Sequence, residues 1–167
     1  MKPKIDPTLV IVLYSCTTGL GLLVGLVPLL SVLGAPIAIL AIVFGSILHY
    51  KLWDALPTSS RATSPGKAVG FLFIPFFNLY WYFVSYAALP TSIQKATGKP
   101  SANGLGVTFA IMSVGQWFFS WIPYVGVLYG IGFYVVWLLY YRAVTRDVNR
   151  YLDGGIEIIP PLPKYRN

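Results

Sequence analysis

The chain has 167 residues, of which 56% are hydrophobic and only 10% are charged, and it carries a formal net charge of +7. Soluble domains have roughly a quarter of their residues charged, so this composition excludes an ordinary water-soluble protein and indicates that lipid is the main solvent. The twelve Lys and Arg residues are spread over four short segments. This spread favours anionic lipid headgroups over nucleic acid as the partner of the positive charge.

Cys16 is the single cysteine of the chain. One thiol cannot form a disulfide or a cysteine-based metal cluster within one chain, so it indicates neither a redox compartment nor a zinc site. Residues 13–16, after a Lys-containing start, also resemble the cleavage site of a bacterial lipoprotein. Because the chain stays strongly apolar after Cys16, we interpret this region instead as a retained signal-anchor helix.

Three long blocks contain no Asp, Glu, Lys or Arg: residues 7–50, 68–94 and 100–141. A helix needs about 20 apolar residues to cross a hydrocarbon core of about 30 Å. The first and third blocks, with 44 and 42 residues, are therefore each long enough for two crossings joined by a turn. The predicted crossings are at about 8–33, 36–53, 104–121 and 124–145.

Glycine and proline mark the two predicted turns. Gly34 is expected to end the first helix, and Pro36 suits the first position of the second helix. Pro123 and Gly126 are expected to serve the same purpose between the third and fourth helices. Pro28 is expected either to kink the first helix or to begin its turn.

The middle block could cross the membrane once, or it could enter the membrane and return. With four crossings, all twelve Lys and Arg lie on one side and the two opposite turns carry none, which is the strongest form of the positive-inside bias. We therefore predict four crossings, with an interfacial or re-entrant segment at 68–90. Its nine aromatic residues favour the headgroup boundary. Pro75 interrupts a helix there, and Asn78 is expected to cap a new one.

The predicted fold is an all-α membrane protein, a single membrane domain of four transmembrane helices arranged as two hairpins around this proline-broken segment. A tail at 146–167 follows on the basic side. Two short stretches within the fold are similar to each other, Ile74-Pro75-Phe76-Phe77 and Ile122-Pro123-Tyr124-Val125. The match is too short to establish a repeat.

Side chains suited to acid–base or hydrolytic chemistry are few and scattered. The five carboxylates all fall in the predicted basic-side loops or tail: Asp6, Asp54, Asp147, Asp153 and Glu157. An enzyme gathers such groups in one site, and the sequence has no paired-carboxylate motif and no glycine-rich phosphate loop after a strand. We therefore expect no catalytic residues, no metal site and a protein that is not an enzyme.

His49 is the one candidate ligand for a haem or chlorophyll. Ala38, Ala41, Gly45 and His49 share one face of the predicted second helix, and small residues mark the face that another helix approaches. His49 is therefore expected to face inward. The alternative, which we favour, is a structural histidine near the basic boundary, close to Lys51.

Small residues recur at four-residue spacing on the predicted helices, which permits close contact between helix backbones. The residues expected to pack in this way are Gly21, Gly25, Ala41, Gly45, Gly106, Ala110, Gly126 and Gly130. The same spacing serves packing against a partner protein, but we favour packing within one bundle.

A basic stripe, formed by Arg142, Arg146 and Arg150, is predicted to extend along the last helix where it leaves the membrane. Each such charge near an anionic surface contributes about 1 kcal/mol, so we expect the stripe to bind lipid headgroups; a specific docking site is the alternative. The proline-rich segment 156–166 is either a polyproline-like arm that binds a partner protein or a frayed tail.

Residues 66–81 have the sequence GKAVGFLFIPFFNLYW. The order of an aromatic residue, Ile-Pro, two residues and Asn-Leu resembles a motif of small multi-spanning bacterial inner-membrane proteins of uncharacterised function, in which it lies between two helical hairpins. The resemblance implies a bacterial inner membrane and a structural break at Pro75 and Asn78. It implies no activity and no catalytic residues.

The function that we expect is a non-enzymatic subunit or scaffold of a larger membrane complex, in contact with the lipid bilayer and with other membrane proteins or further copies of itself. Positive loops favour the cytoplasm for both termini, although an organellar membrane stays open. One alternative is a small oligomeric channel or carrier, with Gln116 and nearby Ser and Thr residues along a water-filled path. The third is a haem- or pigment-binding subunit that uses His49.

Overall fold

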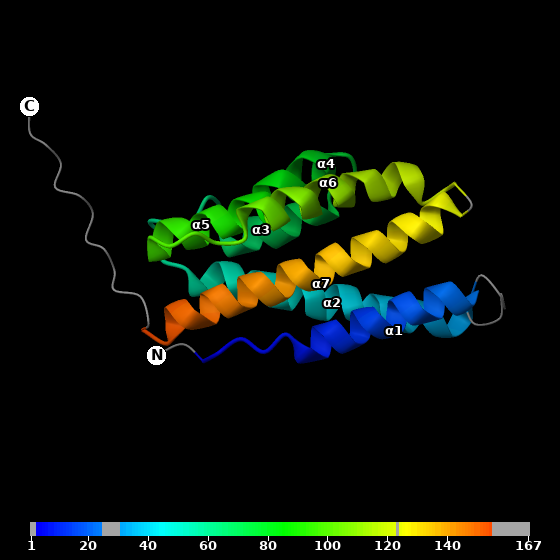
Figure 1. Ribbon diagram of the computed structural model, residues 1–167, viewed down its shortest axis with the longest axis horizontal. Coiled ribbons are helices and arrows are strands. Elements are labelled where there is room, and N and C mark those ends of the chain that lie inside the picture. The colour runs from blue at the N-terminus through cyan, green and yellow to red at the C-terminus, as the bar shows by residue number, and fades with distance from the viewer. Residues whose placement is uncertain (1–2, 25–30, 123, 155–167) are drawn as a thin grey trace, which may run out of the picture.

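The computed structural model describes residues 3–24, 31–122 and 124–154. Four long helices run side by side along its longest axis (Figure 1). They are α1 (Thr8–Val24), α2 (Ser31–Ala55), α6 (Asn103–Phe119) and α7 (Val125–Leu152). Every regular element of the described ranges is helical, which confirms the all-α prediction.

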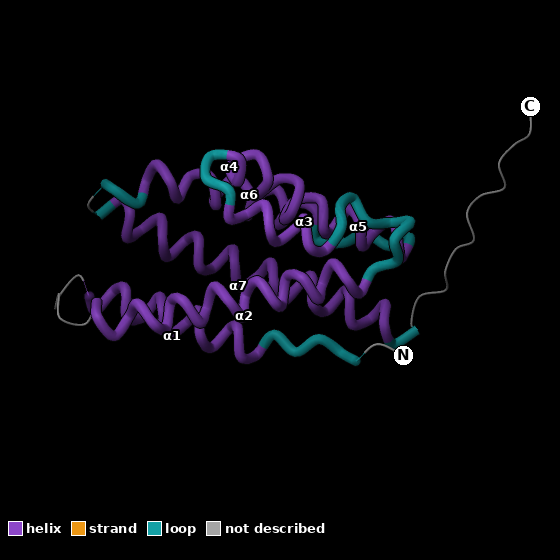
Figure 2. Tube along the Cα trace, turned by 180° about the vertical axis from the view of Figure 1, so that it is seen from behind, coloured by secondary structure: helices purple, strands orange, loops and turns teal. Residues whose placement is uncertain are grey.

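A helical hairpin fills the stretch between α2 and α6. It comprises α3 (Pro65–Gly70), the 3₁₀ turn η2 (Phe71–Phe73), α4 (Phe77–Tyr82), the π-helical turn η3 (Phe83–Ala87) and α5 (Ala88–Thr97). Both ends of this inner hairpin, residues 65–97, lie at the end of the bundle that also holds the N-terminus and the end of α7 (Figures 1 and 2). Its tip, residues 73–76, stops short of the opposite end of the bundle.

Two of the described helices, rather than four, are long and apolar enough to cross a membrane by themselves. They are the part of α2 at Ala38–Ala55 and the whole of α7, Val125–Leu152. In α1 the apolar stretch is shorter, Thr8–Gly19, and α6 has 17 residues. As whole helices, α1 and α6 both have 17 residues, which is the lower limit of about 17 that a crossing requires.

The predicted turn at 34–36 is wrong. α1 ends at Val24 and α2 begins at Ser31, so Gly34 and Pro36 both lie inside α2. A proline inside a helix removes one backbone hydrogen bond, but apolar helices that pack on neighbours accommodate this loss. The prediction for Pro28 falls on a residue outside the described ranges.

The two Ile-Pro-aromatic stretches have the same backbone geometry at their aromatic residue, and Pro123 lies outside the described ranges. Phe76 has φ 61° and ψ −41° before α4, and Tyr124 has φ 62° and ψ −46° before α7. In both, the amide two residues after the aromatic donates to the carbonyl two residues before it, at 3.0 and 2.7 Å. Positive φ is strained in non-glycine residues, so the short sequence match corresponds to one unusual backbone conformation that is used twice.

Asn78 does not cap α4 as predicted. The position before the first helical residue is Phe76, which makes no side-chain capping bond. Asn78 comes one residue into the helix, beyond the place from which a side chain can cap it. It is buried instead, and its Oδ1 has no hydrogen-bond partner.

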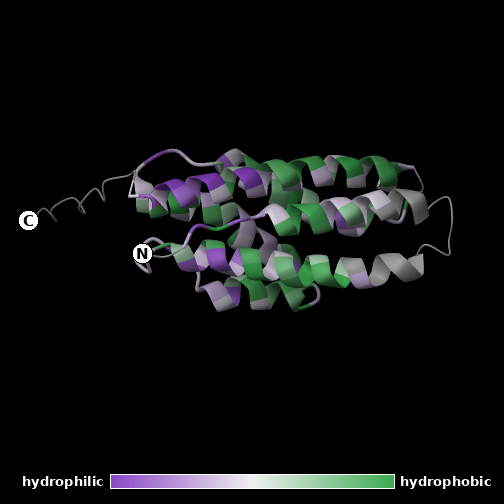
Figure 3. Ribbon diagram, turned by 90° about the horizontal axis from the view of Figure 1, so that it is seen from below, coloured by the Kyte–Doolittle hydropathy of each residue, from purple (hydrophilic) through white to green (hydrophobic). Residues whose placement is uncertain are grey.

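The best-packed part of the core lies toward the end of the bundle where α2 and α7 end (Figure 1). Its fully buried side chains come from α2 and the residue that follows it, from α5 and from α7: Leu52, Trp53, Leu56, Leu89, Ile93, Tyr140, Val144 and Val148. Hydrophilic residues also gather toward this end, while the rest of the helices is mainly hydrophobic (Figure 3). The bundle thus has a polar end with a dense core and a long apolar remainder.

Candidate functional site

The His49 cluster, defined as His49, Trp53, Ser85 and Tyr141, lies where α2, η3 and α7 meet. His49 is 1% exposed, so it faces inward, as expected from the small residues on its face of α2, while its place near the basic boundary stays a prediction. Its Nε2 lies 2.7 Å from Ser85 Oγ and accepts from the Trp53 indole at 3.2 Å. Its Nδ1 lies 3.5 Å from the Tyr141 hydroxyl. Because an indole N–H can only donate, the ring proton of a neutral His49 is assigned to Nδ1.

The cluster continues into the inner hairpin. The one hydrogen of the Ser85 hydroxyl has two acceptors within reach, His49 Nε2 at 2.7 Å and the Ala68 carbonyl at 2.8 Å, and the Trp81 indole donates to the same carbonyl at 3.3 Å. Sequence reasoning missed Ser85, although it is the one Ser or Thr within 68–90. The cluster therefore fastens both arms of the inner hairpin to α2 through buried polar contacts.

A haem or chlorophyll does not fit at His49. Both ring nitrogens have polar neighbours, and the Tyr86 ring lies against the imidazole with a centroid separation of 4.5 Å. Neither cavity described below is lined by His49. In the part of the chain that the structure covers, no group of three or more His, Cys, Asp or Glu side chains could hold a metal ion.

A cavity of about 500 Å³, here called the α7 cavity, lies between α1, the end of α6 and the first half of α7. Four of its lining side chains belong to the polar set expected along a channel or carrier path: Thr17, Thr18, Gln116 and Ser120. Aromatic side chains complete much of the wall, among them Tyr14, Phe133, Tyr134 and Trp137. None of the lining residues is charged, so the structure brings together uncharged polar groups and aromatic rings.

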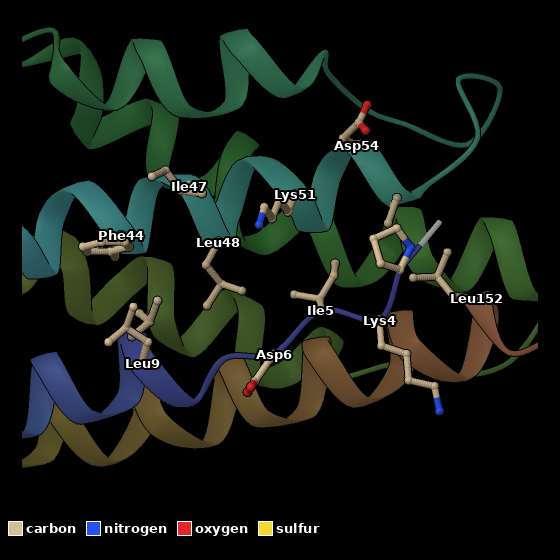
Figure 4. Close-up of a pocket in the computed structure, with 13 residues that line it drawn as sticks. Lys4, Ile5, Asp6, Leu9, Phe44, Ile47, Leu48, Lys51, Asp54 and Leu152 are labelled. Atoms are coloured by element: carbon tan, nitrogen blue, oxygen red, sulfur yellow. The ribbon is translucent and has the colours of Figure 1, made fainter. Parts of the chain in front are cut away.

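A second cavity, of about 540 Å³, lies at the polar end between the extended N-terminal segment, α1 and α2 (Figure 4). Lys51 projects from α2 toward it, whereas the side chains of Lys4 and Asp6 point away from Lys51. Lys4 pairs with Asp153 at 3.1 Å. The charged residues that line this cavity are Lys4, Asp6, Lys51 and Asp54. Their two positive and two negative formal charges balance.

Asp6 stabilises the start of α1. Its Oδ1 accepts from the Thr8 hydroxyl at 2.6 Å and from the Thr8 amide at 2.9 Å. These two hydrogen bonds, the hydroxyl first, hold the pKa of the Asp6 carboxyl below its ordinary value. The carboxylate thus supplies a partner for an amide that the first turn of a helix leaves unpaired.

Asn149 ties the N-terminal segment to α7. Its Oδ1 accepts from the Ile5 amide at 2.9 Å, and its Nδ2 donates to the Ile5 carbonyl at 2.8 Å. One side chain therefore satisfies both backbone groups of a residue that is 144 positions away. No local pattern in the sequence could have revealed this contact.

The predicted packing residues differ in their surroundings. Ala41 and Ala110 are buried, and a Cβ on Gly45 would lie 3.2 Å from the Tyr14 ring. Gly21 lies in α1, but its surroundings are not described, and Gly25 lies outside the described ranges. The α6 and α7 glycines of this set, Gly106, Gly126 and Gly130, enter the arguments below.

The basic stripe of Arg142, Arg146 and Arg150 is exposed on the last turns of α7. Arg146 lies 3.3 Å from the carboxylate of its neighbour Asp147, and a surface pair of this kind contributes little to stability. The stripe is therefore accessible to a charged partner or a headgroup. The segment 156–166 lies outside the described ranges, so its predicted role stays a prediction.

A comparison with protein families, curated proteins and solved structures finds no family model, no curated protein and no solved structure that matches this chain.

Proposed function

We propose that this protein is an integral membrane protein in which α1, α2, α6 and α7 cross the bilayer and the inner hairpin enters and returns on one side. The apolar parts of these helices support the proposal because they expose large hydrophobic side chains. Examples are Ile39 at 61%, Phe118 at 63% and Leu128 at 72%. Water would disfavour such a surface at about 25 cal/mol per Å², whereas lipid tails do not.

The charged ends support one orientation. The charged side chains of the described ranges lie in residues 3–6, 51–67, 95–99 and 142–153, which are all toward the end that carries the termini. Positively charged segments stay on the cytoplasmic side of a bacterial inner membrane. The termini and both ends of the inner hairpin are therefore assigned to the cytoplasm.

Single cysteines in a Cys16→Ser background test this topology. A membrane-impermeant maleimide added to intact cells is expected to label Tyr124→Cys, whose native side chain is 85% exposed at the α6–α7 corner. Ser59→Cys and Lys99→Cys are expected to react only after lysis, because both lie at the polar end. Labelling of these two from opposite sides would mean that the inner hairpin crosses the membrane.

Within this membrane protein, the inner hairpin supports a role as a non-enzymatic subunit or scaffold of a larger assembly. Its tip is irregular between η2 and α4, and it exposes Phe73 at 60% and Phe76 at 79%. Irregular backbone at membrane depth persists only where protein or a water-filled cavity covers it, since lipid cannot satisfy its polar groups. An exposed tip that stops short of the far end of the bundle therefore needs a cover of protein or water, and its exposed Phe73 and Phe76 side chains favour protein.

The cover can be tested by photo-crosslinking in native membranes. A benzoylphenylalanine at Phe76 is expected to give one defined protein adduct, which mass spectrometry would identify. The same group at Leu128 is the matched control, because Leu128 is 72% exposed on regular helix and is expected to react with lipid. If position 76 also yields only lipid adducts, the subunit proposal is wrong.

A small oligomeric channel or carrier is the second candidate, and the α7 cavity is the observation that favours it. Gln116 and three hydroxyl side chains meet in this cavity, which gives the sparse polar residues of the helices one common location. An adduct between two copies at position 76, rather than with a different protein, would favour this candidate.

A further inference from the structure

We propose that the α7 cavity is a binding site for an uncharged, lipid-soluble molecule that carries a hydroxyl group on a ring, such as a phenolic lipid. The proposal rests on the proposed membrane insertion only for the source of the ligand, which is the lipid phase. The volume of about 500 Å³ is within the range of roughly 300–1,000 Å³ that small-molecule sites occupy.

The polar groups of the cavity lack a donor partner. Gln116 Oε1 is buried and has no hydrogen-bond partner. The hydroxyl groups of Thr17 and Thr18 donate to carbonyl groups of their own helix, at 2.8 and 2.9 Å. A buried acceptor without a partner costs free energy. A half-turn of the Gln116 amide exchanges the places of Oε1 and Nε2, so a ligand that donates a hydrogen bond to the turned amide would recover this loss.

The hydrogen of the Tyr134 hydroxyl is also donated within the protein. The Ser15 hydroxyl donates to the Ile11 carbonyl at 2.7 Å, so its oxygen accepts from the Tyr134 hydroxyl, 2.5 Å away. Tyr134 can therefore still accept but cannot donate toward the cavity. The hydroxyl groups of Thr17, Thr18 and Tyr134 thus favour a donor as ligand, and the absence of charged lining residues favours an uncharged one.

A layer of aromatic rings provides the apolar wall. The rings of Tyr14 and Trp137 stack with their centroids 4.2 Å apart, and the ring of Tyr134 stacks with Trp137 at a centroid separation of 6.2 Å. Aromatic faces of this kind bind flat apolar groups through area burial and ring contacts. The ring of the ligand is accordingly expected on this wall, with its hydroxyl toward Gln116.

Two glycines show where the cavity has room. A Cβ on Gly130 would meet no atom within 4 Å, whereas a Cβ on Gly126 would lie 2.8 Å from the Ser120 carbonyl oxygen. Gly126 thus allows the close α6–α7 approach, and Gly130 leaves space open. A large side chain at Gly130 would fill the site from within without a clash at its Cβ.

The test compares 4-octylphenol with 4-octylanisole, which have nearly the same shape and differ in the hydroxyl hydrogen. Ligand binding raises the melting temperature, which can be followed for the full-length protein in detergent. Wild type is expected to reach the same stabilisation at a phenol concentration about tenfold lower than that of the anisole, because only the phenol satisfies Gln116. Equal effects of the two probes on wild type would overturn the proposal.

Two variants test whether the probes bind in the α7 cavity. Gln116→Leu is expected to abolish the preference for the phenol while the anisole response is retained, and Gly130→Phe is expected to remove both responses. Circular dichroism and gel filtration check that each variant is folded. A phenol preference that survives in Gln116→Leu would show that the probes act elsewhere. Failure here leaves the cysteine-labelling and crosslinking results untouched, because those are measured in membranes without any probe.

Discussion

Replacement of His49 by leucine is expected to lower the free energy of unfolding by about 2–4 kcal/mol. The substitution keeps an apolar volume but leaves the Trp53 indole N–H, which donates to His49 at 3.2 Å, without a partner in a buried site. It also removes the contact between Nε2 and Ser85. Each buried polar group left unsatisfied costs about 1–3 kcal/mol.

The measurement is an SDS titration of the purified protein followed by far-UV circular dichroism. Tyr50→Leu is the neighbouring control, because Tyr50 is 46% exposed on the same helix, and surface changes stay within about 0.5 kcal/mol. His49→Gln keeps one acceptor and one donor, so an intermediate loss is expected. If His49→Leu were as mild as Tyr50→Leu, the cluster would not fasten the inner hairpin.

A leucine at Gly106 is expected to destabilise the protein by about 3 kcal/mol, whereas a leucine at Gly130 is expected to be neutral or slightly stabilising. A Cβ on Gly106 would lie 3.0 Å from the Tyr86 carbonyl oxygen and 3.2 Å from Ala87 Cα. Both are backbone atoms of the inner hairpin, which cannot rotate away as a side chain can. Overpacking of this kind forces backbone shifts that cost about 1–3 kcal/mol or more.

The same substitution at Gly130 is the matched control, because both glycines lie in uncharged stretches of helix and a Cβ would meet a neighbour only at Gly106. A leucine also favours helix over glycine by up to about 1 kcal/mol. The two variants are compared by the same SDS titration. Similar losses at both positions would show that the inner hairpin does not rest directly on the α6 backbone.

Charge and the Ile-Pro motif allowed much of this fold to be predicted. From the uncharged blocks, the first residues of α6 and α7 were predicted to within two residues, and Pro75 marked the tip of the inner hairpin. The predicted turn between α1 and α2 was misplaced because Gly34 and Pro36 match the pattern of one helix ending and another beginning. An apolar helix can also contain a proline in its interior, as α2 does at Pro36. Local sequence could not distinguish the two cases.

The candidate sites were less predictable because they depend on contacts between distant segments. The aromatic residues of 68–90 were expected to share the headgroup boundary, but Trp81 is buried beneath Ala68 while Phe76 is exposed. The polar partners of His49 include residues from two other elements, and Gln116 lines the same cavity as Thr17 and Thr18 only after α1 and α6 have both packed on α7. Periodicity along one helix does not contain this information.

The clamp between Asn149 and Ile5 sets an order of assembly during synthesis. The two residues are 144 positions apart, so at about 5–20 residues per second the N-terminal segment waits roughly 7–30 s for its partner to leave the ribosome. The Ser15 contact with Tyr134 must wait in the same way. For most of translation α1 therefore has only α2 among its two long-helix partners, and α7, the last described helix to emerge, is the one that closes the bundle.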